Sequence, residues 1–411
     1  MAGNSSSGIS TSKISTNWSE PEAIEKYSTG VSLHSHTSAS EETLDFIQEM
    51  GLALPGGRIV ARYYERVCRK KYGLKLDFAR GNWRPPLQPR MAYELEKQQI
   101  ERMGLTPLIS ITDHDTIAAA VLLRTMPSSR HIPMSVEWSA PFGRTIFHLG
   151  IHNLPSADAA EWMRRFKSYT AAPDDAKLLA ILRELHEQRQ VMIVFNHPMW
   201  DLYNLGRVHV SEVRRFIAEA GDCVHALELN GLRHAKENQE TERLADETGH
   251  LMISGGDRHG MEPNAILNLT SAKSFTEFVD EIRVERLSHV HFMDQYQQKW
   301  EHRILRSTVD AVTDFPQFVP GWQRWDERAF HPDAQGTMRP LRELWPKGKP
   351  PLGLMTAIRF VRVWARYSCK PESWMAPGVE AGMGAQAASR ADTRNQRVAG
   401  SRLSRPSGVE P

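Results

Sequence analysis

Two histidines that lie two residues apart, His34 and His36, end an apolar run that begins at Val31. Side chains two residues apart lie on the same face of a strand, so both imidazoles could approach one metal cation. Such a pair also occurs by chance on surfaces and in satisfied cores, and alone it is weak evidence for a metal site. The pair gains importance because similar residues recur further along the chain.

Later motifs repeat the pattern of a polar side chain directly after a short apolar run. These residues are His114 in the segment 112–116, Glu137, His148, His197, and Asp257 and His259 in the segment 255–260. Imidazole nitrogens and carboxylate oxygens suit borderline divalent metals, and a carboxylate can bridge two ions. The sequence therefore predicts a site for more than one metal ion at the ends of strands.

The composition narrows the class of protein. Of the 411 residues, 40% are hydrophobic and 24% are charged, and the apolar runs are too short to cross a bilayer. The three cysteines lie far apart without a Cys-x-x-Cys pair, which argues against a disulfide framework and a thiolate zinc site. The formal net charge of +2 gives no overall attraction to nucleic acid. Residues 1–16 lack the hydrophobic segment of a secretory signal, so we expect a cytoplasmic protein without a membrane partner.

Alternating strand and helix patterns run from Val31 to about Arg286. This alternation predicts an α/β fold with a parallel sheet that is closed, or nearly closed, into a barrel over residues 29–288. The functional side chains are expected at the carboxyl ends of its strands. A segment rich in Arg and Lys, residues 51–104, interrupts the barrel. It is either a packing insertion or a lid that brings cations to an anionic substrate.

Other segments are expected to lie outside the barrel. Residues 1–28 and 376–411 predict a disordered arm and a disordered tail, because their composition cannot offset the entropy lost on ordering. Residues 289–375 are rich in Trp and Arg and predict a helical extension. The extension contains an apolar stripe made of Leu354, Ile358, Val361 and Trp364. We expect this stripe to face the protein core rather than a membrane.

The order of the motifs, over roughly residues 31–260, resembles that of the PHP (polymerase and histidinol phosphatase) superfamily of metallophosphoesterases. The resemblance implies a distorted (β/α)7 barrel with a helical insertion and a C-terminal helical extension. It also implies a cleft that holds up to three divalent metal ions, which would be zinc, manganese or iron. The metal ligands implied by the resemblance are His34, His36, His114, Glu137, His148, His197, Asp257 and His259.

The chain departs from the PHP pattern at several places. The family usually has Ser-Asp-Gly shortly after the first histidine pair, and its Asp is also a ligand. This chain has Ser40-Glu41-Glu42 there, and Glu41 is the expected counterpart despite its longer side chain. The same residues are expected to open a helix, with Ser40 as its N-cap. In addition, Arg258 stands between the last two ligands, and His197-Pro198 lacks the following Arg of nucleotide-directed members.

The predicted ligands indicate a reaction. A water molecule that bridges two cations loses a proton near neutral pH, and the cations neutralise phosphoryl oxygens. We therefore expect metal-dependent hydrolysis of a phosphoester by a metal-bridging hydroxide, on a small phosphomonoester or a nucleotide-type substrate. The residues expected to act in catalysis are His34, His36, His114, Glu137, Asp257 and His259. The residues expected to bind the substrate are Arg258, Arg233 and His234, with solvated loop charges as the alternative.

Some assignments stay open from the sequence. Asp113 can either orient His114 or bind metal, Asp115 is expected to cap the following helix, and Glu228 at a strand end has no assigned role. An amidohydrolase also begins with His-x-His on a barrel, but it would need a bridging Lys, two separate later His and a lone Asp. A non-catalytic, metal-stabilised module that binds a partner through its Trp-rich part is a third alternative.

Overall fold

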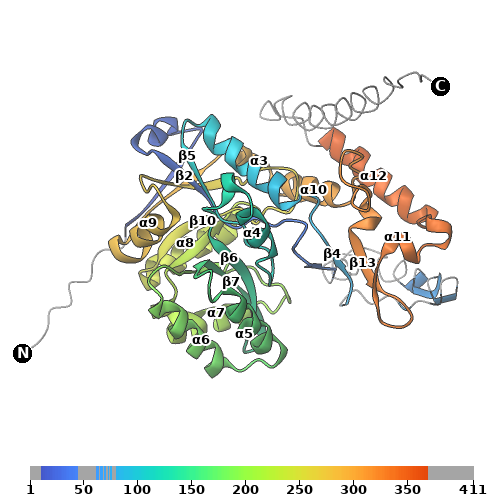
Figure 1. Ribbon diagram of the computed structural model, residues 1–411, viewed down its shortest axis with the longest axis horizontal. Coiled ribbons are helices and arrows are strands. Elements are labelled where there is room, and N and C mark those ends of the chain that lie inside the picture. The colour runs from blue at the N-terminus through green and yellow to red at the C-terminus, as the bar shows by residue number, and fades with distance from the viewer. Residues whose placement is uncertain are drawn as a thin grey trace, which may run out of the picture.

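The chain folds into helices that surround three β-sheets (Figure 1). The computed structural model describes residues 11–44 and 80–368, and between them positions 62–63, 65–67, 69–70, 73 and 75. The predicted α/β class is confirmed. The expected helix near residues 59–72 and the tail 376–411 lie largely or wholly outside the described residues.

The first sheet has five strands in the order β1-β12-β11-β2-β5. Its strands are β1 (Thr11–Thr16), β12 (Leu287–Phe292), β11 (Ile266–Thr270), β2 (Thr29–Ser32) and β5 (Thr106–Ile109). β1 pairs in parallel with β12 along its full length, and a 3-10 turn, η1 (Pro21–Lys26), follows it. The expectation of a disordered arm is therefore wrong from Thr11 onward, because the backbone of β1 finds its hydrogen-bond partners on β12 and becomes the edge strand of the sheet.

The second sheet also has five strands, in the order β10-β9-β8-β7-β6. They are β10 (Leu251–Gly255), β9 (Ala226–Asn230), β8 (Met192–Asn196), β7 (Thr145–Leu154) and β6 (Met134–Phe142). β8, β9 and β10 are parallel, but β6 and β7 form an antiparallel hairpin and β7 is also antiparallel to β8. The hairpin turns at Gly143, whose φ of 54° suits a residue without a side chain.

The predicted closed parallel barrel is not found among the described residues. The strands instead form two mixed sheets, because β6 to β7 and β11 to its neighbours run antiparallel. Two isolated parallel bridges, Ser35 with Arg258 and His114 with Glu137, connect residues that follow strands of the first sheet to the second sheet or its loops. The second bridge joins two predicted ligands, and the first lies between predicted ligands on both segments, so the ends of the two sheets meet at the predicted metal site.

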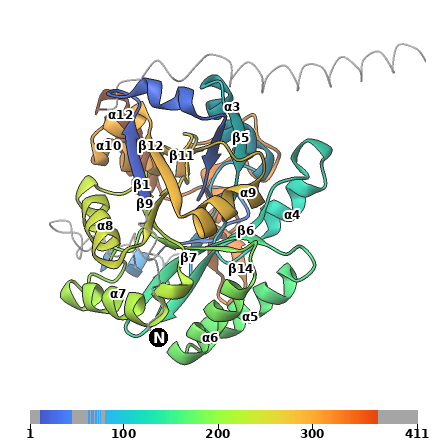
Figure 2. The same cartoon turned by 90° about the vertical axis from the view of Figure 1, so that its left-hand side faces the viewer.

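Helices cover these sheets and close the core. They are α3 (Pro89–Arg102), α4 (Ala118–Arg124), α5 (Ala159–Ala171), α6 (Asp175–Glu187), α7 (Arg207–Ala220), α8 (Ala235–Thr248) and α9 (Phe275–Asp280). Helices α5, α6 and α7 lie together along one side of the second sheet (Figure 2). Trp138 of β6 is fully buried there and stacks on Phe166 of α5, with ring centroids 4.3 Å apart. This apolar layer fixes the positions of the strand ends that carry the site.

A third, smaller sheet joins the N-terminal and C-terminal parts of the chain. Its order is β14 (Met338–Pro340), β13 (Ala329–Pro332), β4 (Asn82–Trp83) and β3 (Glu42–Thr43). The expected helix at Ser40 is therefore wrong, because Glu42 and Thr43 pair with β4 as a strand. The C-terminal part also has α10 (Trp300–Ala311), α11 (Leu341–Leu344) and α12 (Leu352–Ser368). It is thus more than a helical extension, since it supplies two strands to this sheet.

The apolar stripe of α12 is only partly buried. Ile358 is 6% exposed, as expected for a core-facing residue, whereas Trp364 is 53% exposed, so the expectation for Trp364 is wrong. Within the described part of the chain, no helix has the length and apolar character needed to cross a membrane.

Arg328 stabilises the third sheet. Its side chain is buried and donates hydrogen bonds to the carbonyls of Trp322, Ala311 and Thr313, and its own carbonyl accepts from the N–H of Arg84 beside β4. We expect Arg328→Met to lower the free energy of unfolding by on the order of 3 kcal/mol, because buried carbonyls lose their donors. Urea unfolding curves measure this loss. Arg359→Met, at an exposed position of α12, is the matched control, and equal midpoints for both variants would contradict the assignment.

Candidate metal centre

The residues after β2 lie beside the residues after β10, and this pairing brings the first histidine pair to Asp257. The N–H of Asp257 donates to the carbonyl of His34 (2.7 Å), and the N–H of His36 donates to the carbonyl of Arg258 (2.9 Å). His34 and Asp257 have φ values of 60° and 52°, a left-handed conformation that is costly for residues with a side chain. The surrounding hydrogen bonds hold this strained backbone, and the two side chains face each other.

The first group of possible ligands is completely buried. It contains His34, Glu137, His197 and Asp257, and one ligand atom from each lies within 4.8 Å of the others. His34 Nε2 is 2.9 Å from a Glu137 oxygen and 3.6 Å from Asp257 Oδ1. His197 Nε2 is 3.2 Å from the other Glu137 oxygen. Four residues from distant parts of the sequence thus meet as the motifs predicted.

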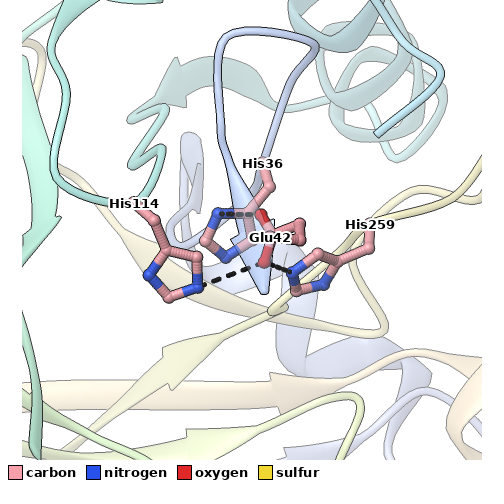
Figure 3. Close-up of side chains that lie close together, drawn as sticks. All are labelled: His36, Glu42, His114 and His259. Atoms are coloured by element: carbon pink, nitrogen blue, oxygen red, sulfur yellow. Dashed lines mark ion pairs between the residues drawn. The ribbon is translucent and has the colours of Figure 1, made fainter. Parts of the chain in front are cut away.

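A second group lies next to the first and contains His36, Glu42, His114 and His259 (Figure 3). Glu42 lies between the imidazoles, with one carboxylate oxygen 3.4 Å from His114 Nε2 and 3.1 Å from His259 Nε2. Its other oxygen is 3.8 Å from His36 Nδ1. The third sheet therefore contributes directly to this group, because Glu42 belongs to β3.

A third group consists of His114, Glu137 and His148. His148 Nδ1 lies 3.3 Å from Glu137 Oε1, and His114 Nε2 lies 3.3 Å from Glu137 Oε2. Glu137 is shared with the first group and His114 with the second. The three groups therefore form one continuous cluster, in which Glu137 occupies the position of a bridging carboxylate.

Glu42, and not Glu41, takes the place that the sequence assigned to Glu41. The Glu41 side chain is 58% exposed and pairs with Arg84 at 2.6 Å, whereas Glu42 is 7% exposed and lies among three imidazoles. The cause is the start of β3 at Glu42, which pairs with Trp83 of β4. Adjacent side chains of an extended backbone point to opposite faces, so Glu41, just before β3, points away from the imidazoles. The sequence offered two adjacent glutamates and no signal to choose between them, because a helix was expected there.

The hydrogen bonds of the site leave several buried atoms without a partner. They are His34 Nε2, His36 Nδ1 and Nε2, Glu137 Oε2 and His148 Nδ1. Buried polar atoms are nearly always satisfied in proteins. Divalent cations would satisfy His34 Nε2, Glu137 Oε2, His148 Nδ1 and one nitrogen of His36, whose other nitrogen carries a proton. Imidazole and carboxylate donors also match the ligand preference of zinc, manganese and iron. The residues therefore fit metal ions.

Burial lowers the pKa values of the imidazoles, and the neighbouring carboxylates raise them. Burial lowers the pKa of His36, but the Glu42, Asp257 and Glu137 carboxylates outweigh it and raise the pKa to about 10. Burial dominates at His114 and His197, whose pKa values fall to about 4 and about 3. A neutral imidazole offers a lone pair to a metal, and carboxylates that favour a proton also favour a metal cation.

Glu228 orients two of the possible ligands. His34 Nδ1 donates to Glu228 Oε1 at 2.5 Å, which leaves Nε2 directed at Glu137 and Asp257. The other Glu228 oxygen accepts from the backbone N–H of His197 at 2.8 Å. Gly255 leaves room for this carboxylate, because a Cβ atom there would lie 1.2 Å from Glu228 Oε1. Carboxylates that hold a metal-binding histidine in this way fix its tautomer and ring orientation.

Two further aspartates lie beside the cluster without joining any of its three groups. Asp113 accepts hydrogen bonds from the N–H and the hydroxyl of Thr37, so it holds the loop after His36. Asp115 accepts from the N–H of Ser139 at 2.9 Å and makes no cap of the following helix. The capping prediction for Asp115 is therefore wrong, and among the described residues the side chain of Asp113 bonds to Thr37 and not to His114.

The residues expected to bind substrate have different surroundings. Arg258 is buried, pairs with Glu96 at 2.8 Å and donates to the carbonyl of Gly260, so two of its nitrogens have partners inside the protein, and its contact with substrate stays a prediction. Arg233 donates to Asp257 Oδ2 at 2.7 Å and lies over the Trp200 ring, beside the first group. His234 is the N-cap of α8, where its Nδ1 accepts from the Lys236 N–H.

Comparisons with known proteins give only distant similarities. No protein-family model matches the sequence, and no curated protein matches it. Structural similarity is found to PsfC from Pseudomonas syringae PB-5123 (13% identity, 53% of this chain and 88% of that chain, TM-score 0.35). It is also found to an amidohydrolase from Chromobacterium violaceum (16%, 43% and 83%, TM-score 0.30) and to a candidate metal-dependent phosphoesterase from Bifidobacterium adolescentis (15%, 49% and 92%, TM-score 0.32). At these TM-scores the similarities carry no functional weight, and the chemistry follows from the side chains.

Separate substitution of the two adjacent glutamates tests which of them belongs to the second group. Glu42→Gln removes the carboxylate shared by three imidazoles, so we expect it to lower the amount of bound metal per chain. Glu41→Gln changes the exposed carboxylate of the residue just before β3 and serves as the control, with an unchanged metal content. Elemental analysis of both purified variants measures the difference. A loss of metal in Glu41→Gln alone would reverse the assignment.

Glu228→Gln tests the orienting role of that carboxylate. Loss of the charge-assisted bond to His34 is expected to weaken metal binding by about 10- to 100-fold, as for other carboxylates that support a metal-binding histidine. Titration against a competing chelator measures the affinity. Glu237→Gln, in the first turn of α8 and outside the cluster, is the control. Equal affinities of the two variants would show that Glu228 has no such role.

Proposed function

We propose that this protein is a metal-dependent phosphoesterase of the PHP type that hydrolyses a phosphomonoester or nucleotide-type substrate. The observation that carries the proposal is the continuous buried cluster in which imidazoles and carboxylates converge with unpaired atoms. Its ligands for up to three zinc, manganese or iron ions are His34, His36, Glu42, His114, Glu137, His148, His197, Asp257 and His259.

The number and kind of ligands support a phosphate-directed reaction. Divalent ions held there would activate water and neutralise phosphoryl oxygens. The carboxylates of Glu42, Glu137 and Asp257 supply three negative charges, fewer than the positive charge of two or three divalent ions. The remaining positive charge suits an anionic substrate, whereas a neutral amide would gain less from it.

The position of Glu137 favours this reaction class over an amidohydrolase. Amidohydrolases of the barrel type use a bridging lysine, but here a carboxylate lies where two ligand groups meet. Asp257 and His259 also enter as a pair from one loop after β10, in place of a lone aspartate. Both features agree with the PHP resemblance of the sequence.

Arg233 is proposed to contact the substrate. Its guanidinium lies beside Asp257 and is held against the Trp200 ring at 4.0 Å, so it borders the first group. A guanidinium in this position can donate two parallel hydrogen bonds to phosphoryl oxygens. His234 is a weaker candidate, since its Nδ1 is already used at the start of α8.

The proposal is tested by metal analysis together with a substrate panel. We expect more than one divalent ion per chain and turnover of at least one of p-nitrophenyl phosphate, its bis ester, histidinol phosphate or a nucleoside bisphosphate. A chelator should remove the activity, and added metal should restore it. Protein that binds no metal, or that turns over only amides, would refute the phosphoesterase proposal.

Asp257→Ala tests whether the first group of possible ligands is needed for catalysis. Its removal should lower turnover on the order of 1000-fold, since metal-assisted charge stabilisation contributes several kcal/mol to such reactions. Asp246→Ala, an exposed position on α8, should leave turnover unchanged. Circular dichroism would show whether both variants remain folded. Normal turnover in folded Asp257→Ala would exclude Asp257 from the site.

A further inference from the structure

A cavity of about 490 Å³ lies at the other end of the second sheet from the metal cluster. Its wall is formed by the ends of α6, α7 and α8 and by the residues around η4 (Glu281–Glu285). Arg189 in this wall precedes β8, whereas His197 of the cluster follows β8. A strand of five residues spans about 17 Å, so the cavity and the cluster are separate sites.

The wall of this cavity is strongly basic. It contains Arg189, Arg283 and Arg286, together with three histidines, and its one acidic residue is Asp222. Helix carboxyl ends carry partial negative charge, and three helices end here. The carbonyls at these helix ends therefore compete with any ligand for the arginine N–H groups.

Arg283 has a structural role. Its guanidinium donates to the carbonyls of His186, Gln188, Arg189 and Val191, which follow or end α6. These bonds satisfy the orphan carbonyls of a helix end. Arg283 therefore closes the wall of the cavity and has little capacity to bind a ligand.

Arg286 and Arg189 keep donors available. Arg286 uses one nitrogen to donate to the Gly249 carbonyl after α8 (2.8 Å), and within the described part of the chain its Nε and other terminal nitrogen make no hydrogen bond. The Arg189 guanidinium is exposed and makes no hydrogen bond or ion pair with any residue that the structure describes. Two guanidinium groups thus border the cavity with unused N–H groups.

The histidines of the wall report the local charge. Burial and then the charge of Arg283 lower the pKa values of His186 and His225, and Arg286 also acts on His225. Burial is the largest cause at His250, where Arg286 contributes in the same direction. Burial is thus the largest cause at all three histidines, and the arginines act in the same direction.

We propose that this cavity binds a small molecule through a phosphate or a similar dianionic group, held by Arg189 and Arg286. Guanidinium groups match the geometry of phosphate oxygens and donate paired hydrogen bonds to them. A volume of about 490 Å³ lies within the usual range for small-molecule sites. The site does not depend on the proposed phosphoesterase activity, because none of its residues belongs to the metal cluster.

The test uses inorganic phosphate as the probe and the full-length protein as purified. Isothermal titration compares wild type with the double variant Arg189→Gln/Arg286→Gln. The control is Arg164→Gln/Arg214→Gln, which removes the same charge from two exposed surface pairs outside the cavity. Hydrogen exchange with and without phosphate locates the bound anion. Thermal melting of each variant confirms that it is folded.

We expect the cavity variant to bind phosphate at least tenfold more weakly at this site, and the control to bind as wild type does. Phosphate should slow exchange in residues 221–225 and 248–250. Phosphate bound at the metal centre would instead slow exchange in residues near 34–37 and 256–259, and this protection would also be found in the cavity variant. The proposal fails if only that protection appears, or if both double variants weaken binding equally.

Discussion

Glu137 is fully buried, and both of its carboxylate oxygens lie within 3.3 Å of imidazole nitrogens. Burial raises the pKa of this carboxyl, but His34, His114 and His148 outweigh it and lower the pKa well below the usual value. A charge withdrawn from water requires compensation in place. Because protonated imidazoles and metal cations are the two available forms of compensation, the arrangement of the ligands around Glu137 governs the rest of the site.

The backbone adapts to this requirement at several points. His34, His197 and Asp257 have positive φ values, although each carries a side chain for which that conformation is unfavourable. Gly255 lacks the side chain that would collide with Glu228. These features lie at the ends of strands and in the loops that follow them, where the two five-stranded sheets approach each other. The regular strands provide rigidity, and the loops absorb the strain needed to aim the ligands.

The candidate ligands that follow a clear apolar run, such as His114 and His197, could be predicted from the sequence. The end of a strand shows in the sequence as a change from apolar to polar residues. The relative direction of neighbouring strands could not be inferred from the apolar runs, so the antiparallel β6–β7 hairpin was predicted as part of a parallel barrel. The choice of Glu42 over Glu41 depends on pairing with β4, which is remote in sequence. The burial of Arg258 likewise depends on Glu96 of α3. Long-range partners decide such cases, and a local pattern does not contain them.

The third sheet extends the dependence of the site to the C-terminal part of the chain. β3 carries Glu42, β4 pairs with β3, and β13 pairs with β4, so a segment near residue 330 supports a ligand near residue 40. Two-residue strands such as β3 and β4 have few hydrogen bonds of their own and are marginal alone. Their stability must come from β13 and from the ligands themselves. The proposed metal binding at the second group would therefore be coupled to folding of this sheet, because each would hold Glu42 in the conformation that the other requires.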